Sequence, residues 1–284
     1  MQEVYEKHST IVFPKAGWIR TGVNFMGQGA QYSNQGFQQL LQELLCRRPE
    51  GKERVQLRLD DAHEAHPKVF VVATDHTNKE PTPFLFRNYE KPDKLSPAGT
   101  HKTEVFRAAM ATSAAPTYFP PVQLEVDSKE LTLVDGGLMA NNPAELAEFE
   151  ARELFPGRSM SCLVSIGTGL SPQQLKGQGN PLLSIPFLLL NSATESEKTH
   201  ERMERKHVSS PCEYYRLNPT GLGVVGLDDT SPKQVAFMKA ETKKYAEQPM
   251  VKEQIKRIVQ LCLKRASSSV SPSPLPSPSP SPSP

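Results

Sequence analysis

Short apolar runs recur along the chain and have the length of buried β-strands. Residues 68–75 (KVFVVATD) form a β-branched run that ends in two polar residues, which is typical of a strand buried on both faces. Comparable runs lie at residues 83–90, 131–134 and 161–169, and a shorter, more exposed one lies at 212–219. The pattern therefore predicts five strands.

Amphipathic helical patterns alternate with these runs. Asn142, Pro143 and Glu145 have the layout of an N-cap, a proline at the first helical position and a capping-box acid, and residues 231–234 (SPKQ) repeat that start signal. The stripes that three helices would bury are Ala144, Ala147, Ala151, Leu154 and Phe155; Val235, Met238, Thr242 and Tyr245; and Val251, Ile255, Ile258 and Cys262. Strands alternating with such helices predict an α/β layered fold with a largely parallel sheet.

The composition changes abruptly after Arg265. Residues 266–284 (ASSSVSPSPLPSPSPSPSP) hold seven of the 26 prolines and almost nothing to bury, so burial cannot offset the entropy lost on ordering them. We therefore expect a disordered Ser/Pro-rich tail at 266–284, preceded by a terminal helix at 251–265 and a folded domain at 1–250.

Charge and cysteine usage narrow the class of protein. The chain of 284 residues carries 33 basic and 31 acidic side chains, a balance that argues against nucleic acid as the main partner. Cys46, Cys162, Cys212 and Cys262 are widely spaced and form no CxxC pair, which favours a reducing compartment over a zinc site or a disulfide framework.

No segment of the sequence has the pattern of a signal peptide or a spanning helix. The N-terminal residues mix acids and bases, and the most apolar stretch, residues 181–190 (PLLSIPFLLL), is half of the roughly 20 residues that a bilayer requires. Core is the favoured interpretation of this stretch, and a patch that dips into a membrane surface is the alternative. We expect a cytoplasmic protein, with peripheral membrane association left open.

One acidic residue stands where a predicted strand ends. The run at 131–134 leads directly into Asp135, which is followed by Gly136 and Gly137. Ligands of α/β sheets gather at the carboxyl ends of strands, and glycines allow a sharp turn and a close approach of the backbone. Asp and Gly are also common turn residues, so the local sequence alone favours a simple turn somewhat over a catalytic base.

Several motifs together favour the catalytic interpretation. ATSAAPTYFPP (111–121), VDGGLMANNPAELA (134–147) and SIGTG (165–169) resemble the patatin-like phospholipase family in order and spacing. The family includes plant patatins and calcium-independent phospholipases. VYEKHSTIVF (4–13), VFVVATD (69–75), YYRLNP and LDDTSP extend the resemblance over roughly residues 1 to 250.

The resemblance implies a modified α/β fold in which a serine nucleophile works with an aspartate and without a triad histidine. It gives Asp135 the role of proton acceptor, with Gly136 and Gly137 as the supporting turn. A free carboxylate, with a pKa of about 4, is a weak base, but partial desolvation and direct contact with the hydroxyl raise its basicity. We expect no cofactor and no metal.

The nucleophile itself is missing from these residues. The family carries its serine in a G-x-S-x-G elbow preceded by a glycine-rich oxyanion loop, and this sequence contains no G-x-S-x-G. The nearest approach, GRSMS (157–161), precedes a strand, and Ser113 in ATSAAP is in the wrong context as well. We therefore expect the C-terminal portion of a patatin domain, incomplete at its N-terminal side, with an exposed sheet edge that a protein partner covers.

Two functions remain in competition. The first is a lipid acyl hydrolase acting on phospholipids or acylglycerols at a membrane or lipid-droplet surface, with this chain inactive alone. The alternative is a non-catalytic pseudoenzyme or interaction module with a flexible tail. GLGVVG (221–226) fits a dinucleotide-binding pattern without the required helix, and SIGTG lacks the lysine of a P-loop, so neither indicates a nucleotide site.

Overall fold

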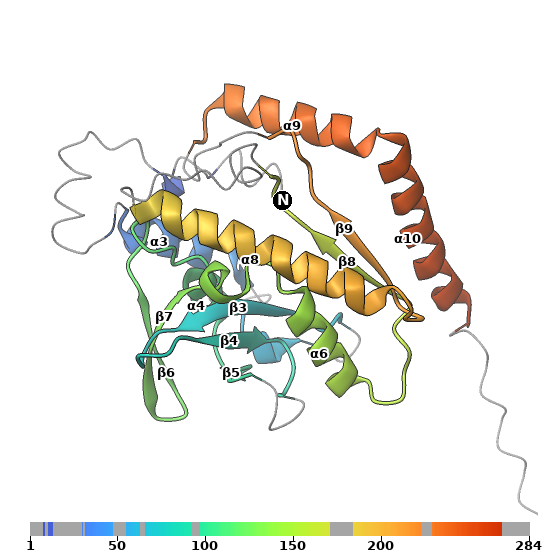
Figure 1. The fold of residues 1–284 in the computed structure, drawn as a ribbon. Coiled ribbons are helices and arrows are strands. Elements are labelled where there is room, and N and C mark those ends of the chain that lie inside the picture. The colour runs from blue at the N-terminus through green and yellow to red at the C-terminus, as the bar shows by residue number, and fades with distance from the viewer. Residues whose placement is uncertain are drawn as a thin grey trace, which may run out of the picture.

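The computed structural model places five strands in one sheet between two layers of helices (Figure 1). The residues it describes are 8, 11–13, 30, 32–47, 55–62, 66–91, 97–170, 184–222 and 229–268, and within 184–194 and 265–268 it describes the backbone alone. The α/β layered fold expected from the sequence is confirmed.

The central sheet has the strand order β5-β4-β3-β7-β6. Its strands are β3 (Phe70–Asp75), β4 (Thr82–Arg87), β5 (Gly99–Thr100), β6 (Val122–Val126) and β7 (Lys129–Asp135). Two small sheets accompany it: β1 (Cys46–Arg47) with β2 (Val55–Gln56), which are antiparallel, and β8 (Cys162–Ile166) with β9 (Glu213–Leu217), which are parallel. All five strands that the apolar runs predicted are present.

The expectation of a largely parallel sheet is wrong. β3 is antiparallel to both β4 and β7, β6 is antiparallel to β7, and only β4 with β5 is parallel in the central sheet. The connections explain this, because a parallel pair needs a crossover of a dozen residues or more. Residues 76–81 join β3 to β4, and Asp127 and Ser128, both with positive φ, turn β6 back into β7, so both pairs are hairpins.

The helices that the structure describes surround these sheets. They are α3 (Asn34–Leu44), the short 3₁₀ helix η1 (Leu59–Asp61), α4 (Val105–Thr112), α5 (Gly137–Ala140), α6 (Ala144–Leu154), α8 (Ser184–His207), α9 (Pro232–Ala246) and α10 (Pro249–Ser268). α9 begins as predicted, because the Ser231 hydroxyl accepts a hydrogen bond from the Gln234 amide at 3.3 Å. The last helix is longer than the predicted 251–265.

Helix α6 buries Ala144 of the predicted apolar stripe, leaves Ala147, Ala151 and Leu154 partly buried, and buries two acids that the stripe did not include. Its buried positions are Ala144, Glu148 and Glu150, whereas Phe155 is 37% exposed. The two carboxylates can be buried because cations meet them: Arg87 contacts Glu150, and Arg152 and Lys206 contact Glu148. Pairing with cations therefore allows two acids of α6 to be buried together with most of the apolar stripe.

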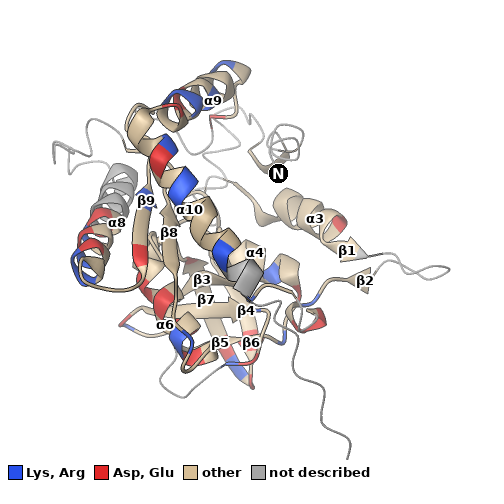
Figure 2. Cartoon of the chain, turned by 90° about the vertical axis from the view of Figure 1, so that its right-hand side faces the viewer, with Lys and Arg blue, Asp and Glu red and all other residues tan. Residues whose placement is uncertain are grey.

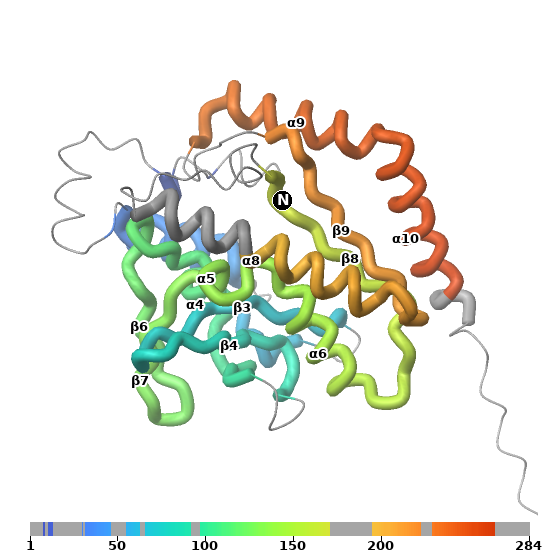
Figure 3. The backbone as a smooth tube through the Cα atoms, in the orientation of Figure 1, coloured from blue at the N-terminus to red at the C-terminus, as the bar shows by residue number. Residues whose placement is uncertain are grey.

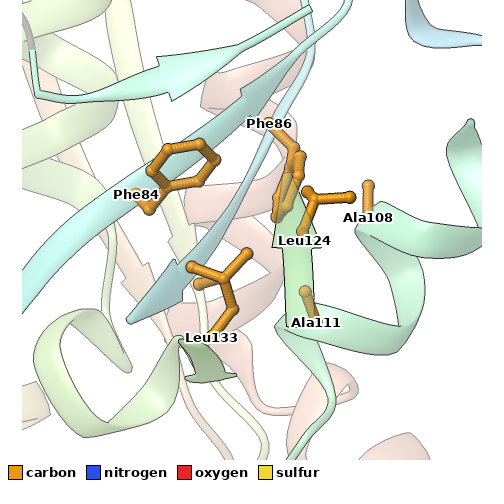
Figure 4. Close-up of a cluster of buried hydrophobic side chains, with 7 residues drawn as sticks. Phe84, Phe86, Ala108, Ala111, Leu124 and Leu133 are labelled. Atoms are coloured by element: carbon orange, nitrogen blue, oxygen red, sulfur yellow. The ribbon is translucent and has the colours of Figure 1, made fainter. Parts of the chain in front are cut away.

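The hydrophobic core lies between α4 and one face of the central sheet (Figure 4). It consists of Ala73, Phe84, Phe86, Ala108, Ala111, Leu124 and Leu133. The small side chains of α4 let the helix approach the large residues of β4 and β7 closely. The opposite face of the sheet carries α5 and, through Arg87 and Glu150, α6.

Three features of the sequence lie wholly or partly outside the described residues. Of the apolar stretch 181–190, only the backbone of 184–190 is described, as the start of α8. The glycine pattern at 221–226 is described only at its first two residues, and residues 269–284 of the tail are not described. Among the helices that are described, none is both long enough and apolar enough to cross a membrane.

Candidate active site

Asp135 is the last residue of β7, which lies beside β3, the central strand of the sheet. Strand β7 brings it opposite Ala73 of β3. The segment after α4 fixes it from the other side, because the Asp135 amide donates to the Ala114 carbonyl oxygen at 3.0 Å. The Thr74 hydroxyl donates to the Asp135 carbonyl oxygen at 2.8 Å. Both main-chain polar groups of Asp135 are thus satisfied, and its position is defined by three elements.

The two glycines after Asp135 have different uses. Gly136 has α-helical angles (φ −66°, ψ −22°), so its backbone conformation is open to any residue. What requires a glycine is space, because a β-carbon at Gly136 would stand 2.0 Å from the Val72 carbonyl oxygen. Gly137 begins α5, and its amide donates to Asp135 Oδ1 at 2.6 Å. The chain therefore passes from strand to helix at this point.

The environment of the Asp135 carboxyl makes it a better base. Burial raises its pKa above the usual range, and the Gly137 amide, which favours the charged form, offsets part of the rise. Only Oδ1 has a donor among the residues that the structure describes, so Oδ2 remains available to accept a proton there. The carboxylate is both desolvated and incompletely hydrogen-bonded, as a general base requires.

A pocket of about 550 Å³ opens beside this carboxyl. It is lined by Lys68, Val69, Phe70, Val71, Val72, Thr112, Asp135, Gly136, Gly137, Ala140, Asn141, Pro143 and Ala147. Apolar side chains and glycine backbone make up most of this lining, with Asp135 as its one carboxylate. The pocket therefore suits an apolar ligand with a single reactive polar group.

One edge of β3 borders the pocket. In the described chain, Phe70, Val71 and Val72 pair with β4 on one side, whereas pairing with β7 begins only at Ala73. On that open side the Val72 carbonyl oxygen accepts a hydrogen bond from the Thr112 hydroxyl. Among the described residues, β3 therefore has no strand partner on this side at Phe70–Val72, and Val72 is buried there against Thr112 and Gly136.

The two serines weighed as nucleophiles are not on strand-to-helix turns. Ser113 follows helix α4 and forms its C-cap, and residues 157–161 follow α6 and precede β8. Neither serine has the geometry of a nucleophile elbow, which requires a sharp turn from a strand into a helix.

A buried polar network connects the motif residues behind Asp135 and was missed by sequence reasoning. Asn142 is 5% exposed, accepts a hydrogen bond from the Ser165 hydroxyl at 2.9 Å and donates to the Ser196 carbonyl oxygen at 3.2 Å. Arg216 donates to the Ser165 hydroxyl at 2.9 Å. The sequence predicted Asn142 as the N-cap of the helix, but α6 begins one residue later, with Pro143 as its N-cap. The Asn142 Oδ1 accepts a hydrogen bond from the Ala144 amide at 3.3 Å in addition to its bond from Ser165.

The glycines of SIGTG are used within the fold. The Gly167 amide donates to the Leu217 carbonyl oxygen and the Gly169 amide to Asn218 Oδ1, both at 2.8 Å. A phosphate cradle needs such amides to point at the ligand, so this segment is a strand end held by β9, as expected. Within the described residues, no group of three or more His, Cys, Asp or Glu side chains is placed to hold a metal ion.

Comparisons with known proteins agree with this fold and site. The family model for patatin-like phospholipases matches residues 2–148, a stretch that includes Asp135, and the chain belongs to this family. It is 31% identical over 237 residues to Phospholipase A I of Arabidopsis thaliana, covering 72% of this chain and 17% of the relative.

Two further relatives come from distant organisms. Calcium-independent phospholipase A2-gamma of Oryctolagus cuniculus is 30% identical over 253 residues, covering 87% of this chain and 30% of the relative. Patatin-like phospholipase 1 of Plasmodium falciparum is 31% identical over 199 residues, covering 62% of this chain and 29% of the relative. The chain thus spans less than a third of the length of these curated relatives.

Proposed function

We propose that this chain is part of a lipid acyl hydrolase in which Asp135 accepts the proton of a serine nucleophile. The observation that carries the proposal is the half-buried Asp135 carboxyl in the wall of an apolar pocket, with a raised pKa and with one oxygen that has no donor among the described residues. Membership of a family named for phospholipases supports the same class of reaction.

The proposed reaction has two steps. The serine oxygen attacks the acyl carbonyl carbon while its proton passes to Asp135, and the alcohol of the ester leaves with a proton. Water then attacks the acyl-enzyme, releases the fatty acid and restores the serine. Asp135 acts as base and then as acid, so the reaction needs no histidine.

The nucleophile belongs to a segment other than these residues, because the 284 residues contain no G-x-S-x-G. The open side of β3 at Phe70–Val72 supports this part of the proposal, since a strand added there would end near Asp135. Until a strand covers this edge, it is also a surface for a protein partner or for aggregation. Alone, the chain would be inactive.

The substrates we propose are phospholipids or acylglycerols in a membrane or at a lipid-droplet surface. The names of the relatives, which are all phospholipases, support this class of substrate.

The test compares two polypeptides from the same gene. One is the 284-residue chain, and the other adds the residues encoded upstream of Met1, in which we expect G-x-S-x-G. Hydrolysis of a short-chain p-nitrophenyl ester by the longer product, with none by the shorter one, is the expected result. Activity of the shorter chain at the level of an intact lipase would overturn the proposal that its nucleophile lies elsewhere.

The second candidate is a non-catalytic interaction module. The observation that favours it is the absence of the elbow motif from the sequence. If the upstream sequence encodes no G-x-S-x-G and neither product hydrolyses esters, the pseudoenzyme is the correct assignment.

A further inference from the structure

Helix α10 runs along the outside of the molecule. Its inner face is anchored, because Val251 is 2% exposed and the Arg257 guanidinium hydrogen-bonds the carboxylate of Glu213 on β9. Figure 1 shows α9 and α10 at the periphery, and Figure 2, viewed from that side, shows α10 in front of the other described elements. The tube in Figure 3 follows the same path. One face of α10 is therefore directed outward.

That outward face is apolar where solvent would favour polar side chains. Ile255, Val259 and Leu263 are 37%, 49% and 64% exposed, and they continue at a spacing of four residues from the buried Val251. Each step of four advances about 40° around the helix, so this apolar row turns from the inner face toward the outward face along α10. Lys252 and Lys256, both exposed, precede Val259 by seven and three residues and so lie along the same face. The face combines an apolar row with a cationic border.

Helix α9 repeats the combination. Phe237 is 41% exposed, and the exposed Lys233 and Lys244 lie four residues before it and seven after it, on the same side of the helix. Glu241, four residues after Phe237, lies on that side as well and pairs with Lys244 at 3.9 Å. Met250, which is 71% exposed, stands at the corner between the two helices. We define the basic apolar surface as Phe237, Met250, Ile255, Val259 and Leu263 together with these four lysines.

Positive charge is concentrated in these two helices. Residues 232–268 contain nine basic residues, Lys233, Lys239, Lys243, Lys244, Lys252, Lys256, Arg257, Lys264 and Arg265, against three acids, Glu241, Glu247 and Glu253. Because the whole chain has almost equal numbers of basic and acidic residues, the other residues carry an excess of acids. Such asymmetry indicates an anionic partner for this part of the molecule.

We propose that the basic apolar surface binds an anionic lipid bilayer, with the apolar row in the headgroup–acyl boundary and the lysines at the headgroups. A helix with an apolar face bordered by lysines binds membranes in this way. A second copy of the chain would instead bring like charge against like charge. The choice of lipid over another acidic partner rests on the proposed function, because the substrate of a lipid hydrolase lies in such a surface.

Vesicle flotation with the purified 284-residue chain tests the proposal. Vesicles of phosphatidylcholine alone are compared with vesicles that also contain phosphatidylserine. Both are tested at low salt and in about 0.5 M NaCl, which screens surface charge strongly. We expect binding to the phosphatidylserine vesicles at least about tenfold stronger than to the neutral ones, reduced by salt. Equal binding to both kinds of vesicle, or to neither, would overturn it.

Two pairs of variants locate the binding surface. Val259→Asp should weaken binding at least about tenfold, because it removes an apolar side chain that the bilayer would bury and adds a negative charge that the anionic lipids repel. Its matched control is Val55→Asp on β2, a valine that is 44% exposed and should leave binding unchanged. The double variant Lys252→Glu, Lys256→Glu should weaken binding about 25-fold or more, because each lysine near the surface contributes about fivefold. Its control is the double variant Lys79→Glu, Lys129→Glu, which should leave binding unchanged.

The remaining outcomes are also decisive. If a variant on α10 and its matched control both lose vesicle binding, with unchanged circular dichroism, the membrane-binding surface lies elsewhere on the molecule. A dimer that light scattering detects and Val259→Asp dissolves would assign the surface to a second copy. Asp135→Asn should bind vesicles as the wild type does, so failure of the proposed catalysis and failure of this inference give different results.

Discussion

Gly136 lies so close to Val72 that a β-carbon on the glycine would stand 2.0 Å from the Val72 carbonyl oxygen and 3.1 Å from the Val72 β-carbon. This contact brings the turn after Asp135 against β3, and it is the reason the candidate base faces the pocket beside the open edge of that strand. The glycine is required by packing, because its α-helical backbone angles place no demand on residue type.

Gly136→Ala should destabilise the fold by about 2–3 kcal/mol, because backbone at a sheet centre cannot move aside without losing its hydrogen bonds. Urea unfolding followed by circular dichroism measures the change. The matched control is Gly36→Ala in α3, where the nearest atom would be 3.5 Å away and alanine should be neutral or stabilising by up to ~1 kcal/mol. Equal stability of wild type and Gly136→Ala would contradict the close contact.

Asp135→Asn should stabilise the fold at neutral pH. Burial raises the folded-state pKa of Asp135 above its ordinary value of 3.8, so in the window between these two values the native state holds a proton that the unfolded state has released. Wild-type stability therefore falls as pH rises through this window, while the variant does not titrate. The stability difference should be near zero below pH 3.8 and reach a plateau above the folded pKa.

Urea midpoints of the two proteins, measured from acid to neutral pH, check this prediction. Asparagine keeps an oxygen for the Gly137 amide, so the comparison isolates the charge. A variant that is less stable than the wild type at neutral pH would mean that the carboxylate is stabilised by its surroundings, which would make it a poor base.

Two ion pairs on helix α6 should differ in how much they contribute to the stability of the fold. Glu150 is buried and accepts hydrogen bonds from Arg87 Nε at 2.7 Å, Arg87 Nη2 at 2.8 Å and the Tyr89 hydroxyl at 2.9 Å. Glu150→Ala leaves the buried guanidinium uncompensated and should cost about 3–5 kcal/mol. Glu145 pairs with Arg202 at the surface, and Glu145→Ala should cost less than about 1 kcal/mol.

Thermal or urea unfolding of the two variants gives the comparison directly. A similar small loss of stability in both variants would show that Arg87 finds other partners when Glu150 is removed. The packing between β4 and α6 would then not depend on this ion pair.

The free cysteines should differ in reactivity. Burial raises the pKa of the Cys212 thiol to about 11, with the charge of Glu148 adding to the rise, whereas Cys262 is exposed on α10. At pH 8 a disulfide reagent such as dithiobis(nitrobenzoate) should label Cys212 at least about 100-fold more slowly than Cys262. Cys262→Ser should remove the fast phase, and fast labelling of Cys212 in the folded chain would contradict its burial.

Sequence patterns predicted the elements well because each apolar run and start signal is local. The run at 131–134 did mark β7, and Ser231 with Gln234 did cap α9. Strand direction was wrong because it depends on the length of the connections, and the two-residue turn at Asp127 and Ser128 leaves room only for a hairpin.

The surroundings of the site were less predictable. Asn142, Ser165 and Arg216 are far apart in the sequence, and nothing in the spacing shows that their side chains meet. The burial of Glu148 and Glu150 likewise depends on cations that other elements supply. Long-range polar pairing carries no local signal, whereas the ends of helices and strands do.

The most direct test of the central claim is the rate of ester hydrolysis by the longer gene product with and without the Asp135 carboxylate. Asp135→Asn should lower kcat/KM by about 10²–10⁴-fold, the usual contribution of a general base, while circular dichroism shows an intact fold. Hydrolysis by Asp135→Asn at the wild-type rate would contradict the claim.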